Sequence, residues 1–176
     1  MHTALQAHPD FPCPAVLSLQ VEVTPQADRL TLVYRLKGDL AALRLPTPAT
    51  PVEPDRLWAH TCFEVFLTRG EGVAYREYNF SPSGQWAAYA FAAYRQRDAA
   101  IPALPAPTLA WNREAGELAL KVTLPAVALP PGDGALYLAL TTVVEQADGA
   151  LSYWALRHPA GKPDFHHRDG FALILP

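Results

Sequence analysis

The segment from residue 57 to residue 94 constrains the fold most strongly, because it reads as three consecutive strands joined by two tight turns. Gly70-Glu71-Gly72 supplies the positive backbone angles that the first turn needs. In Ser81-Pro82-Ser83-Gly84, proline presets one backbone angle and glycine permits another, which is typical of a β-turn. The strands are expected over residues 61–68, 75–81 and 85–93. Together they predict an antiparallel meander.

Alternation along the first of these strands assigns its side chains to two faces. The apolar row expected to face the core consists of Phe63, Val65 and Leu67. The other face is expected to carry the residues of opposite parity, provided that the extended chain reaches back far enough, namely Trp58, His60, Cys62, Glu64 and Phe66. In the third strand, Trp86 is expected to face away from Tyr89 and Phe91, with small alanines leaving room beside the rings.

Alternating apolar residues and turn signals predict further strands over residues 15–23, 29–37, 109–112, 117–124, 136–145, 151–157 and 171–175. Only residues 125–129 are expected to form a short helix, and the prolines of residues 38–56 predict a long ordered loop. Nine or ten short strands predict an all-β, two-sheet antiparallel β-sandwich, immunoglobulin-like or jelly-roll-like. A closed barrel is the alternative. We expect one domain over residues 1–176.

The composition, 50% hydrophobic and 18% charged, predicts a folded protein. The formal net charge of −3 and the scattered Lys and Arg provide no basic field, so nucleic acid is not an expected partner. No apolar run approaches the roughly 20 residues that span a bilayer, so no membrane partner is expected. The N-terminus lacks a basic region followed by an apolar one, which predicts a cytoplasmic location. Cys13 and Cys62 match no metal or redox spacing and are expected to be free thiols.

Aromatic and polar side chains gather around the meander in the combination that a sugar pocket needs. Pyranose C–H groups stack on rings, while sugar hydroxyls bond to amides and charged groups. The candidate platforms are Trp58, Trp86 and Trp154, and the candidate polar partners are His60, Glu64, Asn79, Gln85 and Arg95. A carboxylate in mid-strand, such as Glu64, must be solvated, paired or bound to something. The alternatives are tryptophans that fill the core and an ion pair from Glu64 to Arg76 or Arg95.

Other site chemistries are weaker alternatives. His158, His166 and His167 lie in one polar loop and, with His60, are candidate metal or haem ligands. However, the adjacent His166 and His167 would diverge in an extended chain, so an ordinary hydrogen-bonded loop is favoured and no cofactor is expected. No catalytic motif is present, and two carboxyl groups on neighbouring strands are common in ordinary sheets, so an enzyme is not expected. A protein-interaction scaffold remains a further alternative, and the oligomeric state is open.

Three stretches resemble a bacterial group of DOMON-like proteins related to carbohydrate-binding module family 9. They are LWAHTCFEVFL, YREYNFSPSGQWAAYAF and SYWALRHPAGKPDFHHRDGFAL. The resemblance implies an immunoglobulin-like β-sandwich that binds a sugar or a haem without transforming it. It also implies roles for Trp58 and Glu64 in a first binding strand, Asn79 in the next and Trp154 as a second platform. Haem-binding relatives rely on a methionine, whereas the only methionine here is Met1, so a saccharide is the preferred small-molecule ligand.

Overall fold

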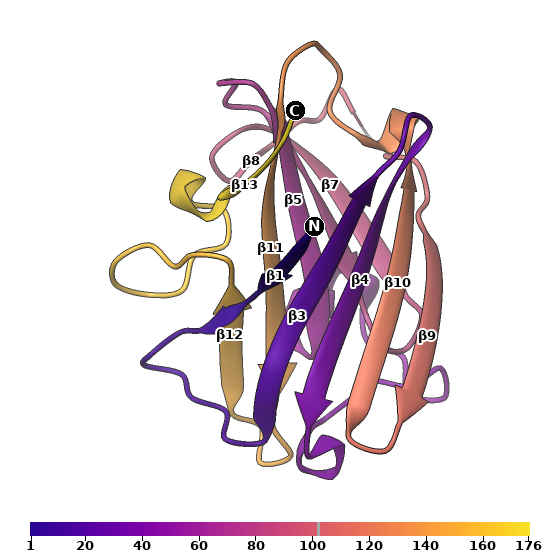
Figure 1. Ribbon diagram of the computed structural model, residues 1–176, viewed down its shortest axis with the longest axis vertical. Coiled ribbons are helices and arrows are strands. Elements are labelled where there is room, and N and C mark those ends of the chain that lie inside the picture. The colour runs from indigo at the N-terminus through magenta and orange to yellow at the C-terminus, as the bar shows by residue number, and fades with distance from the viewer. Residues whose placement is uncertain (102) are drawn as a thin grey trace.

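The computed structural model of the protein describes residues 1–101 and 103–176. Two antiparallel sheets lie face to face (Figure 1). In spatial order, the first sheet contains β1 (His2–Ala4), β3 (Val16–Pro25), β4 (Arg29–Gly38), β10 (Glu117–Pro125) and β9 (Thr108–Glu114). The second contains β2 (Gln6–Ala7), β12 (Leu151–Ala155), β11 (Leu136–Glu145), β5 (Cys62–Arg69), β6 (Tyr75–Phe80), β7 (Trp86–Ala93) and β8 (Gln96–Arg97). A last strand, β13 (Leu173–Leu175), pairs with β11.

This arrangement confirms the predicted all-β, two-sheet sandwich. Each sheet runs from one edge strand to another without closing, so the barrel alternative is wrong. Helical structure in the described residues is limited to short 3₁₀ segments, namely η1 (Leu40–Ala42), η2 (Pro54–Ala59), η3 (Ala126–Ala128) and η4 (Arg168–Gly170). The helical turn predicted within residues 125–129 is therefore confirmed as η3, but the expectation that no other segment is helical is wrong, because η1, η2 and η4 lie in segments that were expected to be loops or strand.

The core lies between the sheets and is built by the predicted alternation. Phe63, Val65 and Leu67 of β5 are fully buried there, as expected. They pack with the inward rows of the facing sheet, which include Leu19, Val21, Val23, Leu32, Tyr34, Leu36, Leu120 and Val122. The Tyr34 hydroxyl donates a hydrogen bond of 2.7 Å to the backbone carbonyl of Glu64, so this buried phenol is satisfied from the opposite sheet. The core thereby fixes the register and facing of β5.

The outer face of the second sheet is also partly covered. A second apolar cluster there joins Phe66, Tyr75, Phe91, Ala139 and Phe171. Phe171 and its neighbour Phe165 belong to the chain that follows β12 and folds back over this face. Residues Cys62 to Thr68 are consequently buried on both sides of the sheet. A strand buried on both faces leaves a charged side chain such as Glu64 little access to solvent.

The start of β5 differs from the prediction. The extended chain does not reach back to Trp58, because residues 54–59 form η2 and the backbone N–H of His60 donates to Leu57 O at 3.1 Å. Pro54 stands in the first turn of η2, where its fixed φ suits a helix and its missing N–H costs nothing. Trp58 therefore takes its position from a 3₁₀ turn. The short strands β1 and β2 were not predicted, because two or three residues are too few for alternation to reveal.

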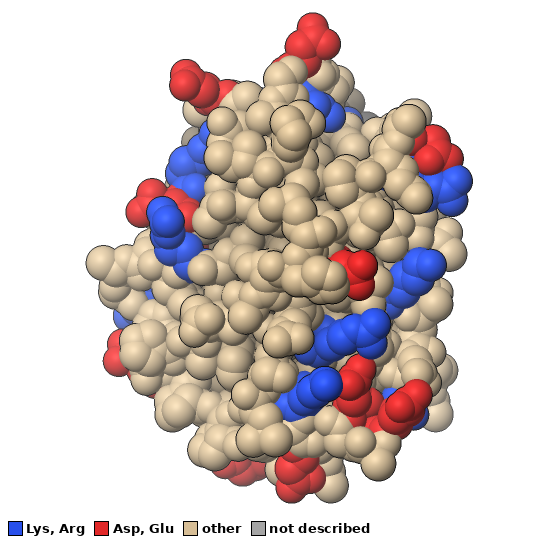
Figure 2. Space-filling model, in the orientation of Figure 1, with Lys and Arg blue, Asp and Glu red and all other residues tan. Residues whose placement is uncertain are grey.

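Charged groups of both signs are mixed on the visible face of the molecule. In Figure 2, Lys and Arg side chains lie beside Asp and Glu on this face. Glu117, for example, pairs with Arg35 at 3.2 Å and with Lys37 at 3.4 Å. Neither sign therefore forms a continuous field on this face. Within residues 1–101 and 103–176, no helix is both long and apolar enough to cross a bilayer.

Candidate functional site

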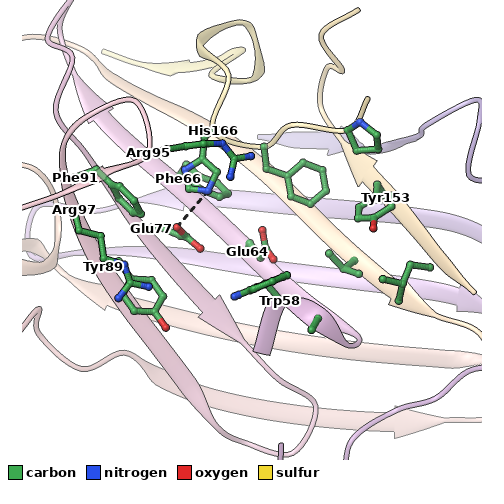
Figure 3. A pocket seen from close by; sticks show the side chains of 15 residues that line it. Trp58, Glu64, Phe66, Glu77, Tyr89, Phe91, Arg95, Arg97, Tyr153 and His166 are labelled. Atoms are coloured by element: carbon green, nitrogen blue, oxygen red, sulfur yellow. Dashed lines mark ion pairs between the residues drawn. The ribbon is translucent and has the colours of Figure 1, made fainter. Parts of the chain in front are cut away.

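A pocket with a volume of about 470 Å³ opens on the outer face of the second sheet (Figure 3). Its floor comes from β5, β6 and β7, and its walls come from η2, β8, β12 and the loop after β12. The rings that line it are Trp58, Phe66, Tyr89, Phe91, Tyr153 and Phe165. The polar side chains that line it are Glu64, Glu77, Arg95, Arg97 and His166. This combination of aromatic walls and a few polar groups is typical of small-molecule sites.

Strand register explains why these residues meet. In β5, Glu64 pairs with Asn79 of β6, and Phe66 pairs with Glu77. Directly opposite residues of antiparallel strands point to the same face, so these four side chains share the outer face. On β7, Asn79 pairs with Ala87, whose small side chain leaves the space above the floor open.

Glu64 lies at the floor without a charged partner. The residue is 2% exposed, and its Oε2 accepts a hydrogen bond of 3.1 Å from Thr141 Oγ1. Its Oε1 is buried and has no hydrogen-bond partner. Burial, and secondly the negative charge of Glu77, raise the pKa of the Glu64 carboxyl well above its usual value. The site thus holds a carboxyl group that prefers its protonated form and has one oxygen free.

The ion pair that was the alternative for Glu64 is not formed. Arg76 donates instead to the backbone carbonyls of Val127 and Leu129 at 3.0 and 2.8 Å. Arg95 pairs with Asp164 at 2.8 Å. The carboxyl group of Glu64 is therefore left to the pocket.

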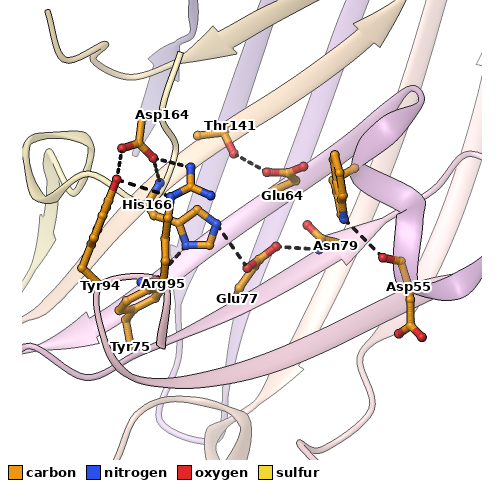
Figure 4. Close-up of polar contacts among 11 residues, drawn as sticks. Asp55, Glu64, Tyr75, Glu77, Asn79, Tyr94, Arg95, Thr141, Asp164 and His166 are labelled. Atoms are coloured by element: carbon orange, nitrogen blue, oxygen red, sulfur yellow. Dashed lines mark hydrogen bonds and ion pairs between the residues drawn. The ribbon is translucent and has the colours of Figure 1, made fainter. Parts of the chain in front are cut away.

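Glu77 and Asn79 continue the polar floor (Figure 4). Asn79 Nδ2 donates to Glu77 Oε1 at 2.7 Å, while the buried Asn79 Oδ1 has no partner. Burial raises the pKa of Glu77 to about 7, against the opposing effects of the Asn79 hydrogen bond and of the Arg97 and Arg95 charges. Glu64 and Glu77 are thus two neighbouring carboxyl groups that both resist ionisation.

Arg95 anchors the loop over the pocket. It is a non-glycine residue in the left-handed region, with φ of 56°, and its backbone N–H donates to the Tyr75 hydroxyl at 3.0 Å. The same hydroxyl lies 2.8 Å from His166 Nδ1. Since the Tyr75 oxygen already accepts from Arg95, its proton is available to His166 Nδ1, which favours the tautomer with hydrogen on Nε2. That nitrogen lies 3.9 Å from Glu77 Oε2.

His166 is uncharged at neutral pH. Burial, and then the positive charge of Arg95, lower the pKa of His166 to about 4, although Asp164 acts in the opposite direction. Figure 4 shows Arg95, Asp164 and His166 on one side of Glu77, with Glu64 farther along the floor. The positive charge in the pocket therefore comes from Arg95 and Arg97, and the imidazole acts as a neutral hydrogen-bonding group.

Of the three candidate tryptophans, Trp58 alone lines the pocket. Its residue is 50% exposed, and its Nε1 donates to Asp55 O at 3.2 Å. Trp86 pairs with the core residue Phe80, so it lies on the inward side of the sheet, as its alternation predicted. Trp154 packs in the core, 8% exposed, with Nε1 donating to Ser152 Oγ at 3.0 Å. The structure therefore does not bring the three rings together.

The remaining polar candidates also divide into residues at or beside the pocket and residues away from it. Arg95 lines the pocket, and Asn79 lies beside the lining residue Glu64 without lining the pocket itself, whereas His60 does not line it. His60 Nδ1 lies 2.8 Å from Glu145 Oε2, and Arg44 shares this carboxylate at 3.0 Å. The expectation that His60 continues the face of Glu64 fails because η2 ends immediately before it.

Gln85 binds the loop that precedes η2. Its Nε2 donates to Val52 O at 2.8 Å, and its Oε1 accepts from the backbone N–H of Val52 at 2.9 Å. Both polar atoms of the amide are thus used within the protein. By tying down Val52, Gln85 supports the segment that carries Trp58 into the pocket wall.

Gln85→Ala is expected to lower the free energy of unfolding by about 1 kcal/mol, because the change removes two hydrogen bonds to a loop that keeps access to water. Urea denaturation measures this value, and faster amide exchange at Val52 should accompany it. Gln26→Ala, at an exposed turn position, is the matched control and should change stability by less than about 0.5 kcal/mol. Equal stability of the two variants would contradict the supporting role of Gln85.

The three loop histidines take separate roles. His158 Nε2 lies 2.8 Å from the backbone carbonyl of Gln6, and His166 lines the pocket. His167 precedes η4 and accepts a hydrogen bond from Asp169 N through Nδ1 at 3.3 Å. Over the part of the chain that the structure describes, no group of three His, Cys, Asp or Glu side chains is placed to hold a metal ion.

Several pocket residues were absent from the predicted site, among them Tyr89, Arg97, Tyr153 and Phe165. Tyr153 was detectable in principle, because the neighbour of an inward residue in a strand points outward, and Trp154 is inward. The same parity places Tyr89 on the face of Glu77, with which it pairs. Arg97 stacks on Tyr89, with the guanidinium carbon 3.7 Å from the ring centroid. No signal in the sequence indicated that Phe165 folds back over this face.

Comparisons with known proteins identify relatives by structure alone. No protein-family model matches the chain, and no curated protein matches its sequence. The crystal structure of a "putative carbohydrate-binding protein" from Bacteroides uniformis matches with a TM-score of 0.71 and 15% identity, over 96% of this chain and 83% of that one.

A carbohydrate-binding module of family 9 from Caldicellulosiruptor kristjanssonii also matches, in two complexes. Its glucose complex gives a TM-score of 0.55 and 8% identity, over 82% of this chain and 69% of that one. Its cellotriose complex gives a TM-score of 0.57 and 8% identity, over 89% of this chain and 75% of that one. At these identities the likeness concerns the fold: the chain shares the β-sandwich of these solved structures.

Proposed function

We propose that this protein is a non-catalytic saccharide-binding module, and that the sugar binds in the pocket on the outer face of the second sheet. The observation that carries the proposal is the buried Oε1 of Glu64, a pocket-lining residue, which has no hydrogen-bond partner; beside it, Asn79 Oδ1 on the paired strand is also buried without a partner. Buried polar atoms in native proteins are nearly always paired, so these two favour a ligand that brings hydrogen-bonding groups. Sugar hydroxyls both donate and accept, and can therefore satisfy either oxygen.

The walls of the pocket also suit a sugar. Trp58 and Tyr153 present rings on which pyranose C–H groups can stack, and Arg95 and Arg97 offer N–H donors at the side of the pocket. A volume of about 470 Å³ lies within the range of roughly 300–1,000 Å³ that is usual for small-ligand sites. In this arrangement the aromatic rings provide contact area, and the polar groups select the orientation of the ligand.

The electrostatics favour binding over glycoside hydrolysis. A glycosidase needs one ionised and one protonated carboxyl group, with pKa values driven apart by different environments. Here burial raises the pKa of both Glu64 and Glu77. Neither carboxyl group therefore has the ordinary or lowered pKa that keeps a glycosidase nucleophile fully ionised.

The fold relatives support the same reading. The family 9 module was solved with glucose and with cellotriose, and the Bacteroides protein is described as carbohydrate-binding. We propose that the chain is a DOMON-like, family 9-like module forming one domain, since a single core cluster spans both sheets. A shared fold does not by itself assign a ligand, so the proposal of a saccharide depends on the pocket residues described above.

Isothermal titration calorimetry with a panel of mono- and disaccharides tests the proposal. We expect saturable binding of at least one sugar, and a loss of affinity of about tenfold in Trp58→Ala, because the variant removes a ring from the pocket wall. Trp86→Ala is the matched control, since Trp86 lies on the inward side of the same sheet and should leave the affinity unchanged. A flat response to the whole panel at millimolar concentrations would sink the proposal.

A further inference from the structure

The charged groups of the pocket are unevenly distributed. Arg97 stacks on Tyr89 at the β7 and β8 side, and Arg95 is held there by Asp164. Glu64 lies toward the other side, where its neighbours Trp58 and Tyr153 carry no positive charge (Figure 3). Among the described residues, Glu64 takes part in no ion pair, and one of its oxygens is unpartnered and buried. The more buried of the two glutamates that line the pocket therefore lacks a cation.

If the carboxyl groups of the pocket all ionise, one negative charge is left without a counterpart. Ionisable groups from every element packed there face Glu64 or border the same pocket. They are Tyr34, Cys62, Glu77, Tyr89, Arg95, Arg97, Tyr153, Asp164 and His166. Tyr34, Tyr89, the buried thiol and His166 are neutral near pH 7, because burial raises the pKa of the two phenols and of the thiol and lowers the pKa of His166. Three carboxyl groups, those of Glu64, Glu77 and Asp164, then share the two guanidinium groups of Arg95 and Arg97. A single additional cation would allow all three carboxyl groups to ionise.

A ligand can supply that cation at low cost. An ammonium group beside Glu64 would gain a charge-assisted hydrogen bond to Oε1. Nearby aromatic faces, such as those of Trp58 and Tyr153, also attract cations. A neutral sugar, by contrast, would leave Glu64 protonated and would gain only a neutral hydrogen bond from that side chain. The difference in binding free energy between a ligand with an ammonium group and a neutral sugar sets the specificity of the site.

We propose that the ligand is an amino sugar with a free, unacylated amine, and that its ammonium group binds Glu64 at the pocket floor. This inference rests on the proposed saccharide-binding function and names the class of sugar. The aromatic walls hold the pyranose ring, and Arg95 and Arg97 remain at the opposite side of the pocket for hydroxyl groups. An N-acetyl group would remove the positive charge and add bulk at the deepest point of the site.

Titration calorimetry at pH 6.5 with matched sugars tests this inference on the wild-type protein. The probes are glucosamine and galactosamine, each compared with its parent sugar and its N-acetyl form. At least one amino sugar is expected to bind at least tenfold more tightly than both of its partners. Binding should also release protons, seen as heats that depend on the buffer, because the ammonium group drives ionisation of Glu64.

Glu64→Gln attributes the preference to this side chain. In the variant, the ratio of amino-sugar to parent-sugar affinity is expected to fall to about one, and proton release should be lost. If glucose or galactose binds to the wild-type protein as well as its amino form does, the inference fails while the proposed function stands. If no sugar of any kind binds, the proposed function fails too. The wild-type ratio and proton release decide the question even if the variant is unstable.

Discussion

Replacing Trp154 with alanine is expected to lower the free energy of unfolding by about 3–5 kcal/mol, the usual cost of removing a large buried ring from a core. Trp154 is 8% exposed and packs within the main apolar cluster between the sheets. Its loss would leave a cavity and remove the donor to the buried Ser152 hydroxyl, which accepts from Trp154 Nε1 at 3.0 Å and itself donates to Val144 O at 3.4 Å. Urea denaturation followed by circular dichroism measures the change.

Trp58→Ala is the matched control for this experiment. Trp58 stands on η2 and is 50% exposed, so its removal is expected to change the free energy of unfolding by less than about 1 kcal/mol. The two tryptophans thus separate stability from binding, because Trp58 is also the residue expected to affect sugar affinity. If Trp154→Ala proved as stable as Trp58→Ala, the assignment of Trp154 to the core would be wrong.

The sequence predicted the sandwich because most strands are long enough to alternate. The row Phe63, Val65 and Leu67 is buried as expected, and the strand at residues 136–145 has the bounds that its pattern indicated. Turn chemistry also carried information, since Gly149 adopts φ of 92° in the hairpin that Asp148-Gly149 predicted. The alternation of apolar residues within each strand and the residues of the turns are sufficient to predict the strands and the sandwich.

The site was less predictable because its composition depends on contacts between distant segments. Arg95 meets Asp164, and Tyr75 meets His166, across separations that no local pattern encodes. Large aromatic residues suit both a core and a binding platform, so the candidate tryptophans could be distinguished only by strand register. Glu64 was identifiable because a carboxylate in mid-strand is costly wherever the fold places it.

Glu64→Gln is expected to raise the free energy of unfolding of the unliganded protein by about 3 kcal/mol at pH 8, with little effect at pH 4. Burial raises the folded-state pKa of Glu64 well above 4.5, its value in an unfolded chain. The unfolded state therefore loses this proton first as pH rises, and the wild-type protein becomes less stable over the range above about pH 4.5. Glutamine keeps the shape of the side chain and does not titrate.

Two other groups, Glu77 and His166, titrate in the same pH range. Glu77, with a pKa raised to about 7, lowers stability as pH rises from 4.5, whereas His166, with a pKa lowered to about 4, lowers stability as pH falls below 6.5. The difference between Glu64→Gln and wild type at each pH, measured by urea denaturation, removes the contribution of His166 and reports Glu64 together with its coupling to Glu77. A constant difference from pH 4 to pH 8 would show that Glu64 is ionised normally in the folded protein. In that event Glu64 would not be the unpaired carboxyl group with a raised pKa on which the binding proposals depend.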